Sequence, residues 1–391
     1  MSSLNVGVIG CGNISTIYLQ NIPAYHALSL RACADARPEA AQAQASRFNV
    51  EALPVDELLA REDIDLVVNL TIPGAHFGVS LAALRAGKHV FSEKPLAVDF
   101  EEGRALVQEA EARGLLLGCA PDTFLGAGGR LARKLVDEGA VGRVLSGTAF
   151  LMSHGMEHWH PDPEFFFKPG GGPILDMAPY YLAALVNLIG PVKRVLAMSS
   201  IGFPERVVTS NSPRKGDRIA VETPTHVQAL LEFASGAQVT FCMSWDVWKH
   251  GHPAIELYGS EGSLRVPDPN FFGGQVELTE RGGEWRAVDS SEMPLGAANW
   301  RSPNWAPDAP SRANYRALGL ADLASAVLKG TPHRSSGRLG LHVLEVMHCI
   351  LEGAATGQPM AITTTLERPA VLEDAEAAGL WKGLPQTASA A

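Results

Sequence analysis

The sequence predicts an N-terminal α/β domain built on a doubly wound parallel sheet, followed by an α+β domain with a large open, mostly antiparallel sheet. Two observations predict this. From Leu4 to about Pro121, apolar β-favouring runs alternate with helical patterns, as a parallel sheet requires. After Asp122, strand-like runs follow one another with few helices between them. We therefore divide the chain of 391 residues into domains at 1–122 and 123–391.

The first stretch that carries chemistry joins an apolar run to two glycines. Leu4 to Ile9 is β-favouring and leads into Gly10 and Gly12, and a segment with helix character follows. Gly10 allows a sharp turn out of the strand, and Gly12 leaves room for a pyrophosphate at the helix N-terminus, beside Asn13 and Ile14. Ser15 takes the place of a third glycine and is small enough for close packing of helix on strand.

An acidic residue completes this pattern. Asp35 closes the next apolar run, where a carboxylate binds the adenosine ribose hydroxyls. Strand, glycines, helix and acid at this interval predict a dinucleotide-binding Rossmann domain. The carboxylate repels a 2′-phosphate and favours NAD, whereas Arg37 could hold that phosphate, so NADP is the alternative.

The rest of this domain supplies further residues to the same crevice. We expect a helix at 55–60, a strand at 65–70, a helix at 75–86 with Gly87 after it, a strand at 88–92, a helix capped by Asp99 and ending near Arg113, and a strand at 115–119. Ligands lie outside the carboxyl ends of parallel strands. Besides Gly10 and Asp35, the crevice is therefore expected to hold Thr71, Pro73, His76, Glu93 and Lys94.

In the second domain, one long helix interrupts the strands. We expect strands near 143–151, 194–199, 226–233, 238–243, 255–258 and 275–279, a helix at 131–138 and a helix at 172–189 bounded by glycines. Residues 286–311 are polar and contain prolines, which predicts a long loop. A loop of that length is typically a lid, a binding loop or disordered. Helices at 315–328 and 340–355 and a strand near 360–364 are expected to follow.

Lys94 and a helical pair supply the candidate catalytic groups. Lys94 follows a parallel strand in Glu93-Lys94-Pro95, where an ammonium can stabilise the alkoxide that develops as hydride leaves. Asp176 and Tyr180 are four residues apart and share one helix face. The carboxylate, the phenol and the lysine together predict a proton-transfer group. A surface lysine and an ordinary amphipathic helix are the structural alternatives.

These stretches together resemble the glucose–fructose oxidoreductase / inositol dehydrogenase / MocA family of NAD(P)-dependent oxidoreductases. The resemblance also includes Thr71-Ile72-Pro73 with His76 and the run from Tyr258 to Leu264. It implies a Rossmann domain, an open-sheet domain that often builds oligomers, and hydride transfer at a carbinol carbon of a sugar or cyclitol. Lys94 and Asp176 fall on family catalytic positions.

The sequence departs from the family pattern at two positions. Many members have His where this chain has Tyr180, whereas the glucose–fructose oxidoreductase and dihydrodiol dehydrogenase branches are similar to it in having Tyr. Some of those enzymes oxidise an aldose at its anomeric carbon. Asp35 in turn departs from the NADP preference expected of the Tyr-type branches.

Several polar and aromatic residues are candidates for the substrate site. Trp159 and His160 precede the catalytic helix, Asp122 and Thr123 follow a Rossmann strand, and Trp300, Trp305 and Arg316 could stack on or hydrogen-bond a sugar ring. The tryptophans could equally be packing or interface residues. His154, His158 and His160 with Asp162 invite a metal hypothesis, but their spacing matches no zinc signature, so no metal is expected.

Composition narrows the partners and the compartment. A net charge of −10 disfavours nucleic acid and anionic membranes. The five cysteines are scattered and odd in number, which is typical of reduced thiols in the cytoplasm. We find no signal peptide and no apolar run of membrane-spanning length.

The sequence therefore predicts a cytoplasmic, homo-oligomeric (dimeric or tetrameric) NAD-dependent dehydrogenase that acts on a sugar, glycoside or cyclitol. The alternatives are an NADP-linked aldose 1-dehydrogenase, a keto-sugar reductase, a non-catalytic NAD-binding sensor and a metal-dependent hydrolase.

Overall fold

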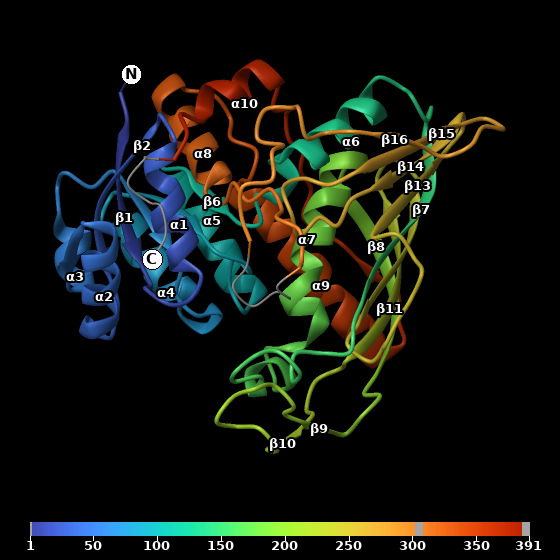
Figure 1. Cartoon of the computed structure of the whole chain (residues 1–391), viewed down its shortest axis with the longest axis horizontal. Coiled ribbons are helices and arrows are strands. Elements are labelled where there is room, and N and C mark those ends of the chain that lie inside the picture. The colour runs from blue at the N-terminus through green and yellow to red at the C-terminus, as the bar shows by residue number, and fades with distance from the viewer. Residues whose placement is uncertain (1, 302–307, 385–391) are drawn as a thin grey trace.

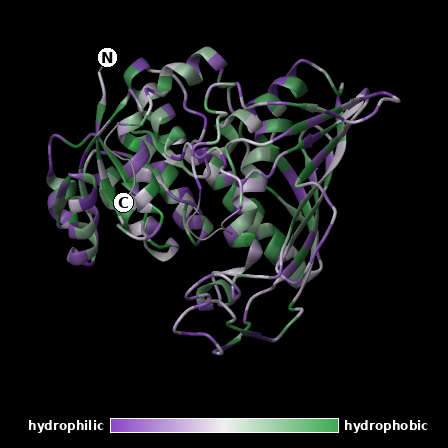
Figure 2. Ribbon diagram, in the orientation of Figure 1, coloured by the Kyte–Doolittle hydropathy of each residue, from purple (hydrophilic) through white to green (hydrophobic). Residues whose placement is uncertain are grey.

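A computed structural model describes residues 2–301 and 308–384, and it contains two large sheets joined by helices (Figure 1). The N-terminal sheet lies at one end of the molecule and the larger C-terminal sheet at the other. Hydrophobic residues concentrate on the strands and on the helices between the sheets, and hydrophilic ones on the outer helices and loops (Figure 2).

The N-terminal sheet is parallel and six-stranded, with the order β3-β2-β1-β4-β5-β6. Its strands are β1 (Leu4–Ile9), β2 (Leu28–Ala34), β3 (Glu51–Leu53), β4 (Leu66–Asn69), β5 (His89–Ser92) and β6 (Leu117–Cys119). Helices cover both faces: α1 (Ser15–Asn21) with η1 (Ile22–Ala24), α2 (Pro38–Phe48), α3 (Val55–Ala60), α4 (Pro73–Arg85) and α5 (Phe100–Arg113).

Alternation along β4 shows why both faces are covered. Val68 packs into the core that contains Tyr18 of α1 and Ala45 of α2. Its neighbour Val67 packs into the other core, with the helices α3 to α5. Successive side chains of a strand point to opposite faces, so an apolar strand needs a helical layer on each side. The predicted α/β domain is confirmed.

The predicted cap of α5 is also confirmed. The Asp99 carboxylate accepts hydrogen bonds from the backbone N–H groups of Glu101 and Glu102, at 2.8 and 3.2 Å. These bonds satisfy two of the amides that a helix start leaves without partners.

The C-terminal sheet has nine strands in the order β16-β15-β14-β13-β7-β12-β11-β8-β17. Only the β7–β12 pair is parallel, so the predicted mostly antiparallel sheet is confirmed. Its strands are β7 (Val144–Met152), β8 (Val192–Ser200), β11 (His226–Phe233), β12 (Gln238–Ser244), β13 (Ile255–Gly259), β14 (Gly262–Val266), β15 (Val276–Glu280), β16 (Arg286–Val288) and β17 (Met360–Ala361).

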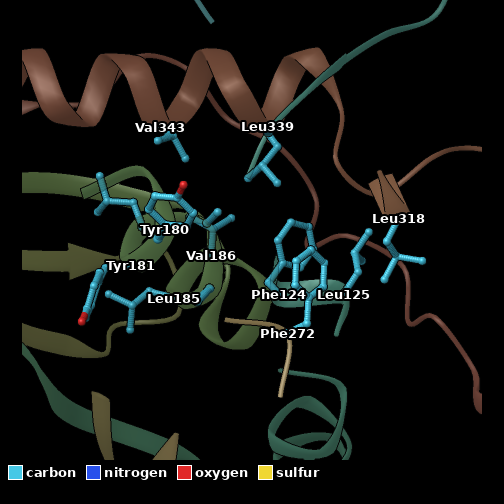
Figure 3. Packing of buried hydrophobic residues seen from close by; sticks show 14 of the residues in the cluster. Phe124, Leu125, Tyr180, Tyr181, Leu185, Val186, Phe272, Leu318, Leu339 and Val343 are labelled. Carbon is cyan, nitrogen blue, oxygen red and sulfur yellow. The ribbon is translucent and has the colours of Figure 1, made fainter. Parts of the chain in front are cut away.

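One face of this sheet is covered by α7 (Gly172–Ile189), with η2 (Thr123–Leu125), α6 (Ala127–Asp137) and α9 (Gly337–Thr356) around it. Figure 3 shows Leu185 and Val186 of α7 within the buried cluster, near Leu339 and Val343 of α9. The expectation that no apolar run reaches membrane-spanning length needs correction, because α7 is long and apolar enough to span a membrane by length and composition. However, 83% of that helix is buried inside the structure, as in the core helix of a globular domain.

The chain returns to the N-terminal sheet after the large sheet is complete. Helices α8 (Leu318–Lys329) and α10 (Asp374–Leu380) lie beside the N-terminal sheet and its helices (Figure 1). Cys119 of β6 donates its N–H to Ser335 at 3.0 Å, and the Tyr25 and Trp381 rings meet edge to face at 4.8 Å. Distant segments thus complete the core around the N-terminal sheet.

A small lobe lies at one end of the large sheet (Figure 1, bottom). We call it the β9–β10 lobe; it comprises residues 153–171 and 201–225. It contains η3 (Glu164–Phe167), β9 (Glu205–Val207) and β10 (Arg218–Ala220). Its residues Met156, Phe167, Val208, Ile219 and Val221 form a separate apolar core together with Trp245, which follows β12.

The prediction of a continuous loop at 286–311 is partly wrong. This stretch begins with β16, which pairs with β15, and Trp300 forms an isolated bridge with Arg312. The short runs at β3, β9, β10, β14 and β16 were not predicted, nor was α10. The strand expected near 360–364 is reduced to Met360–Ala361. Such short elements depend on pairing with distant partners more than on their own periodicity.

Candidate active site

The turn after β1 has the geometry that a dinucleotide needs. Gly10 has φ of +103°, and a side chain there would meet the backbone of Leu70 at 2.5 Å. No atom lies within 4 Å of the position that a Cβ would take on Gly12, so this face of the turn is open. Asn13 and Ile14 follow in the turn, and Ser15 packs beneath it, donating its hydroxyl to the Gly12 carbonyl at 2.6 Å.

Asp35 is tied to this turn from the end of β2. Its Oδ2 accepts the backbone N–H of Cys11 at 2.7 Å, and its Oδ1 accepts the N–H of Arg37 at 2.9 Å. The Arg37 side chain is exposed, with its Nε 3.8 Å from the same carboxylate. Asp35 therefore lies beside the glycine turn, where an adenosine ribose would meet it. The residues present fit NAD.

The turn after β4 is held by buried polar groups. Asn69 Oδ1 accepts both the N–H and the hydroxyl of Thr71, at 3.2 and 2.7 Å. His76 is buried, with its Nδ1 2.6 Å from the Pro95 carbonyl and its Nε2 3.0 Å from the Thr71 carbonyl. His76 thus connects the turn that ends in Pro73 with the turn that carries Lys94, and a direct contact with cofactor stays a prediction.

Glu93 is the centre of a buried ionic cluster. Its Oε1 accepts from the Tyr18 hydroxyl at 2.9 Å and from Arg316 Nη1 at 3.3 Å, and its Oε2 accepts from the Lys94 N–H at 3.0 Å. Burial alone would raise the pKa of Glu93, but Arg316 and Lys94 lower it below its usual value. The carboxylate is therefore charged, and it fixes the backbone at Lys94.

Lys94 meets the C-terminal domain at Asp176. Its Nζ donates to the backbone carbonyl and to Oδ1 of Asp176, at 2.6 and 2.9 Å. Burial opposes the charge on Lys94, but Asp176, Tyr180 and Glu93 together raise the pKa above its ordinary value. An ammonium has three N–H donors, so one remains after these two bonds.

Tyr180 lies one helical turn beyond Asp176. The Lys94 ammonium is 5.3 Å from the centre of the Tyr180 ring. Figure 3 shows the Tyr180 hydroxyl pointing away from that of Tyr181, the next residue of α7. The structure thus brings the three predicted catalytic residues together.

A pocket adjoins the Lys94–Asp176 pair. Pro73 and Lys94 line it from the cofactor domain, and Phe165, Leu175 and Asp176 line it from the other domain. The pocket lies where the turns after β4 and β5 meet the start of α7.

The predicted substrate residues are divided among several places. Trp159 is exposed and meets the His160 ring edge to face at 5.3 Å, and His160 packs on Phe166 of the β9–β10 lobe. Trp300 is backbone-paired to Arg312, and Trp305 lies outside the described residues.

Three of the predicted substrate residues are buried behind Glu93. Asp122 Oδ2 accepts the Gly319 N–H at 2.9 Å, and burial raises the pKa of Asp122 to about 6. Thr123 is buried beside it, and Arg316 is paired with Glu93. A direct contact of these residues with substrate stays a prediction. In the part of the chain that the structure describes, no group of three or more His, Cys, Asp or Glu residues could hold a metal ion.

Sequence reasoning missed Tyr18 and Phe165. Tyr18 carries no motif, since a tyrosine in an amphipathic helix is ordinary. The run Phe165-Phe166-Phe167 could have indicated a residue that lines a pocket. Three consecutive aromatic side chains cannot all point into one core, so at least one of them must face elsewhere.

Two family models match most of the chain. Residues 4–120 match the oxidoreductase family with an NAD-binding Rossmann fold, and residues 130–265 match the GFO/IDH/MocA C-terminal domain.

Curated relatives and solved structures agree with these matches. Levoglucosan dehydrogenase of Pseudarthrobacter phenanthrenivorans is 29% identical over 68% of this chain and 73% of its own. The 1,5-anhydro-D-fructose reductase of Ensifer adhaerens is 28% identical over 80% and 84%, and the myo-inositol 2-dehydrogenase of Thermotoga maritima is 26% identical over 72% and 80%.

The fold is also shared with a structure of levoglucosan dehydrogenase in complex with NADH and L-sorbose. That structure has a TM-score of 0.78 at 24% identity and covers 93% of this chain and 100% of its own. The chain therefore belongs to the GFO/IDH/MocA family and is an NAD-binding oxidoreductase.

Proposed function

We propose that this enzyme transfers hydride between the nicotinamide and a hydroxyl-bearing carbon of a sugar, glycoside or cyclitol. The observation that carries the proposal is the Lys94–Asp176 pair, which joins the two domains at the end of the cofactor crevice. In this proposal the two domains have separate roles: residues 1–122 bind the cofactor, and residues 123–391 supply the substrate site. The similarity to levoglucosan, anhydrofructose and inositol enzymes supports this substrate class.

Each catalytic residue has one role in the proposed mechanism. NAD held at the Gly10–Asp35 crevice would supply its nicotinamide ring as the hydride acceptor. Lys94, held charged by Asp176, uses its remaining N–H to bind the reacting oxygen and to stabilise the alkoxide. Because Lys94 stays protonated, it is not the base. Tyr180 accepts the hydroxyl proton, and in the reverse direction it donates that proton to the carbonyl oxygen.

Gly10, Gly12, Asn13, Ile14 and Asp35 bind the adenosine diphosphate part in this proposal, and Thr71, Pro73 and Glu93 shape the nicotinamide end. The Asp35 carboxylate favours NAD over NADP. Keto-sugar reduction is the second candidate, because Tyr180 can serve as an acid and one relative is a reductase. An NADP-linked aldose 1-dehydrogenase remains the variant implied by the Tyr-type branches.

A screen of absorbance at 340 nm tests the proposal. NAD and NADP are offered with aldoses, glycosides and inositols, and the reduced cofactors with keto-sugars. We expect turnover with NAD and one class of sugar. NAD binding in calorimetry without turnover of any compound in either direction would contradict the proposed substrate class.

We also propose that the enzyme is a cytoplasmic homo-oligomer. Leu196, Met198 and Leu230 of β8 and β11 are exposed, whereas their neighbours Val195 and Leu231 are buried in the core that contains α7. Because successive side chains of a strand point to opposite faces, the exposed side chains form an apolar face away from α7, which is typical of a subunit interface. Cys11, Cys33, Cys119, Cys242 and Cys349 are buried free thiols, which fits a reducing compartment. We expect Met198→Glu to lower the mass measured by light scattering, whereas a wild-type monomer would contradict the proposal.

A further inference from the structure

The β9–β10 lobe carries a second pocket, at the end of the large sheet. Its volume is about 280 Å³. His154 and Glu157 line it from the segment after β7, Phe203 and Arg206 from β9 and the turn before it, and Trp248 from the segment after β12. None of these residues lines the pocket beside Lys94 and Asp176, and the proposed mechanism uses none of them.

Aromatic rings form one wall of this second pocket. The Trp248 ring stacks on His154 with centres 3.2 Å apart and an angle of 16° between the planes. Trp248 is nevertheless 79% exposed, so the opposite face and the edges of its indole ring are open. The Phe203 ring meets His154 edge to face at 5.8 Å. An open aromatic face is a surface on which the C–H face of a sugar ring can pack.

Polar atoms without partners are concentrated beside these rings. Within the described residues, Glu157 Oε2, Arg206 Nε and His154 Nδ1 are buried and make no hydrogen bond. The Glu157 and Arg206 side chains are more than nine-tenths buried. The carboxylate oxygen accepts a hydrogen bond, whereas the guanidinium nitrogen donates one. A ligand that satisfies both kinds must itself donate and accept, as hydroxyl groups do.

The charged lining residues Glu157, Glu205 and Arg206 each have an ion-pair partner already. Arg206 Nη1 pairs with Glu157 at 2.9 Å, and Arg206 Nη2 pairs with Asp246. Glu205 at the rim is paired with Arg218. An anion that binds Nη1 or Nη2 of Arg206 would have to displace a carboxylate, and a cation that binds Glu157 Oε1 would have to displace Arg206. Both exchanges cost buried ion pairing, so a neutral ligand is favoured.

We propose that this pocket binds one ring of a neutral carbohydrate, with the ring on Trp248 and its hydroxyls directed at Glu157 and Arg206. The proposal extends the proposed function, since it adds a carbohydrate subsite to an enzyme whose proposed substrates are sugars. His158 lines this pocket, and Phe165, seven positions later, lines the pocket beside Lys94 and Asp176. The ring is either the distal part of a longer glycoside substrate or a separate sugar.

The test compares Trp248→Ala with Trp285→Ala. Trp285 lies between β15 and β16, where the Arg265 guanidinium packs on its ring at 4.0 Å, and it serves as a matched control. The full chain saturated with NAD is titrated by calorimetry with glucose, xylose, galactose and myo-inositol, and with the disaccharides maltose, cellobiose and gentiobiose. Melting temperatures verify that each variant is folded.

We expect Trp248→Ala to weaken binding of at least one of these compounds about three- to tenfold, the range expected for loss of one aromatic contact, and Trp285→Ala to leave it unchanged. A distal-ring site weakens only the disaccharides. A separate site appears as a second monosaccharide bound per wild-type chain, which the variant loses. Identical binding curves for the wild type and Trp248→Ala across the panel would overturn the proposal. The readout is binding, so a failure of the catalytic proposal would show separately as absent turnover.

Discussion

The Lys94 ammonium donates to both the backbone carbonyl and the Oδ1 of Asp176, at 2.6 and 2.9 Å, across the boundary between the two domains. These bonds keep the ammonium protonated and hold it in one orientation, and they leave one N–H donor for a substrate oxygen.

Replacing Lys94 with Met is expected to lower kcat by about 10³-fold, since it removes the donor that stabilises the alkoxide. The affinity for NAD, measured by calorimetry, should change little. Lys134→Met, on the exposed side of α6, is the control and should retain wild-type kcat. A Lys94→Met enzyme with normal turnover would show that the site is assigned wrongly.

Tyr180→Phe is expected to lower kcat by about 10²- to 10⁴-fold, the usual contribution of a proton-transfer group. The neighbouring Tyr181 provides a matched control, because its hydroxyl donates instead to Asp268 at 3.4 Å. Tyr181→Phe should therefore leave kcat close to that of the wild type. If the two variants lost activity equally, Tyr180 would have no special role in proton transfer.

Asp35→Ser is expected to shift the preference for NAD over NADP, measured as a ratio of kcat/KM, by about 10²-fold toward NADP. The physical reason is removal of a carboxylate that would face the 2′-phosphate. Asp35→Asn tests charge alone, because it keeps an oxygen that can accept the Cys11 N–H. An unchanged ratio in both variants would exclude Asp35 as the determinant.

Arg316→Met is expected to destabilise the protein by about 3–5 kcal/mol, because it leaves Glu93 charged and buried without its main partner. Glu93→Gln in the same chain should restore part of that loss. In the wild type the pKa of Glu93 is lowered on folding. The contribution of Glu93 to stability is therefore complete above its pKa in the unfolded chain, about 4.3. It is lost as the pH falls through the lower pKa that Glu93 has in the folded protein. Urea unfolding between pH 6 and 3 should show a smaller loss in Glu93→Gln than in the wild type.

His342 of α9 is expected to make stability depend on pH at milder acidity. Its Nε2 accepts the Val192 N–H at 3.0 Å, and its Nδ1 lies 2.8 Å from the Thr364 hydroxyl. Burial lowers the pKa of His342 to about 4. The neutral ring is favoured in the folded state, so stability should fall by about 3 kcal/mol as the pH decreases from about 6.5 to 4. His342→Gln should flatten the urea-unfolding profile over that interval, and an unaltered slope would contradict this assignment.

The sequence by itself determined the fold class of both sheets and the positions of the candidate site residues along the chain. Gly10, Gly12 and Asp35 follow strands at intervals that depend on local geometry alone, because a strand end, a tight turn and a helix start involve neighbouring residues. Asp176 and Tyr180 share a face for the same reason, since the helical repeat is local.

The tertiary structure decided which groups face one another. Nothing near Arg316 in the sequence shows that it meets Glu93, 223 residues away, or that Tyr18 binds the same carboxylate. Helices α8 and α10 complete the cofactor domain although they follow the large sheet in the chain. The pocket beneath Trp248 joins three segments that have no common motif. Contacts of this kind arise from packing between distant segments, whose free energy depends on the whole arrangement and leaves no periodic signal in any one of them.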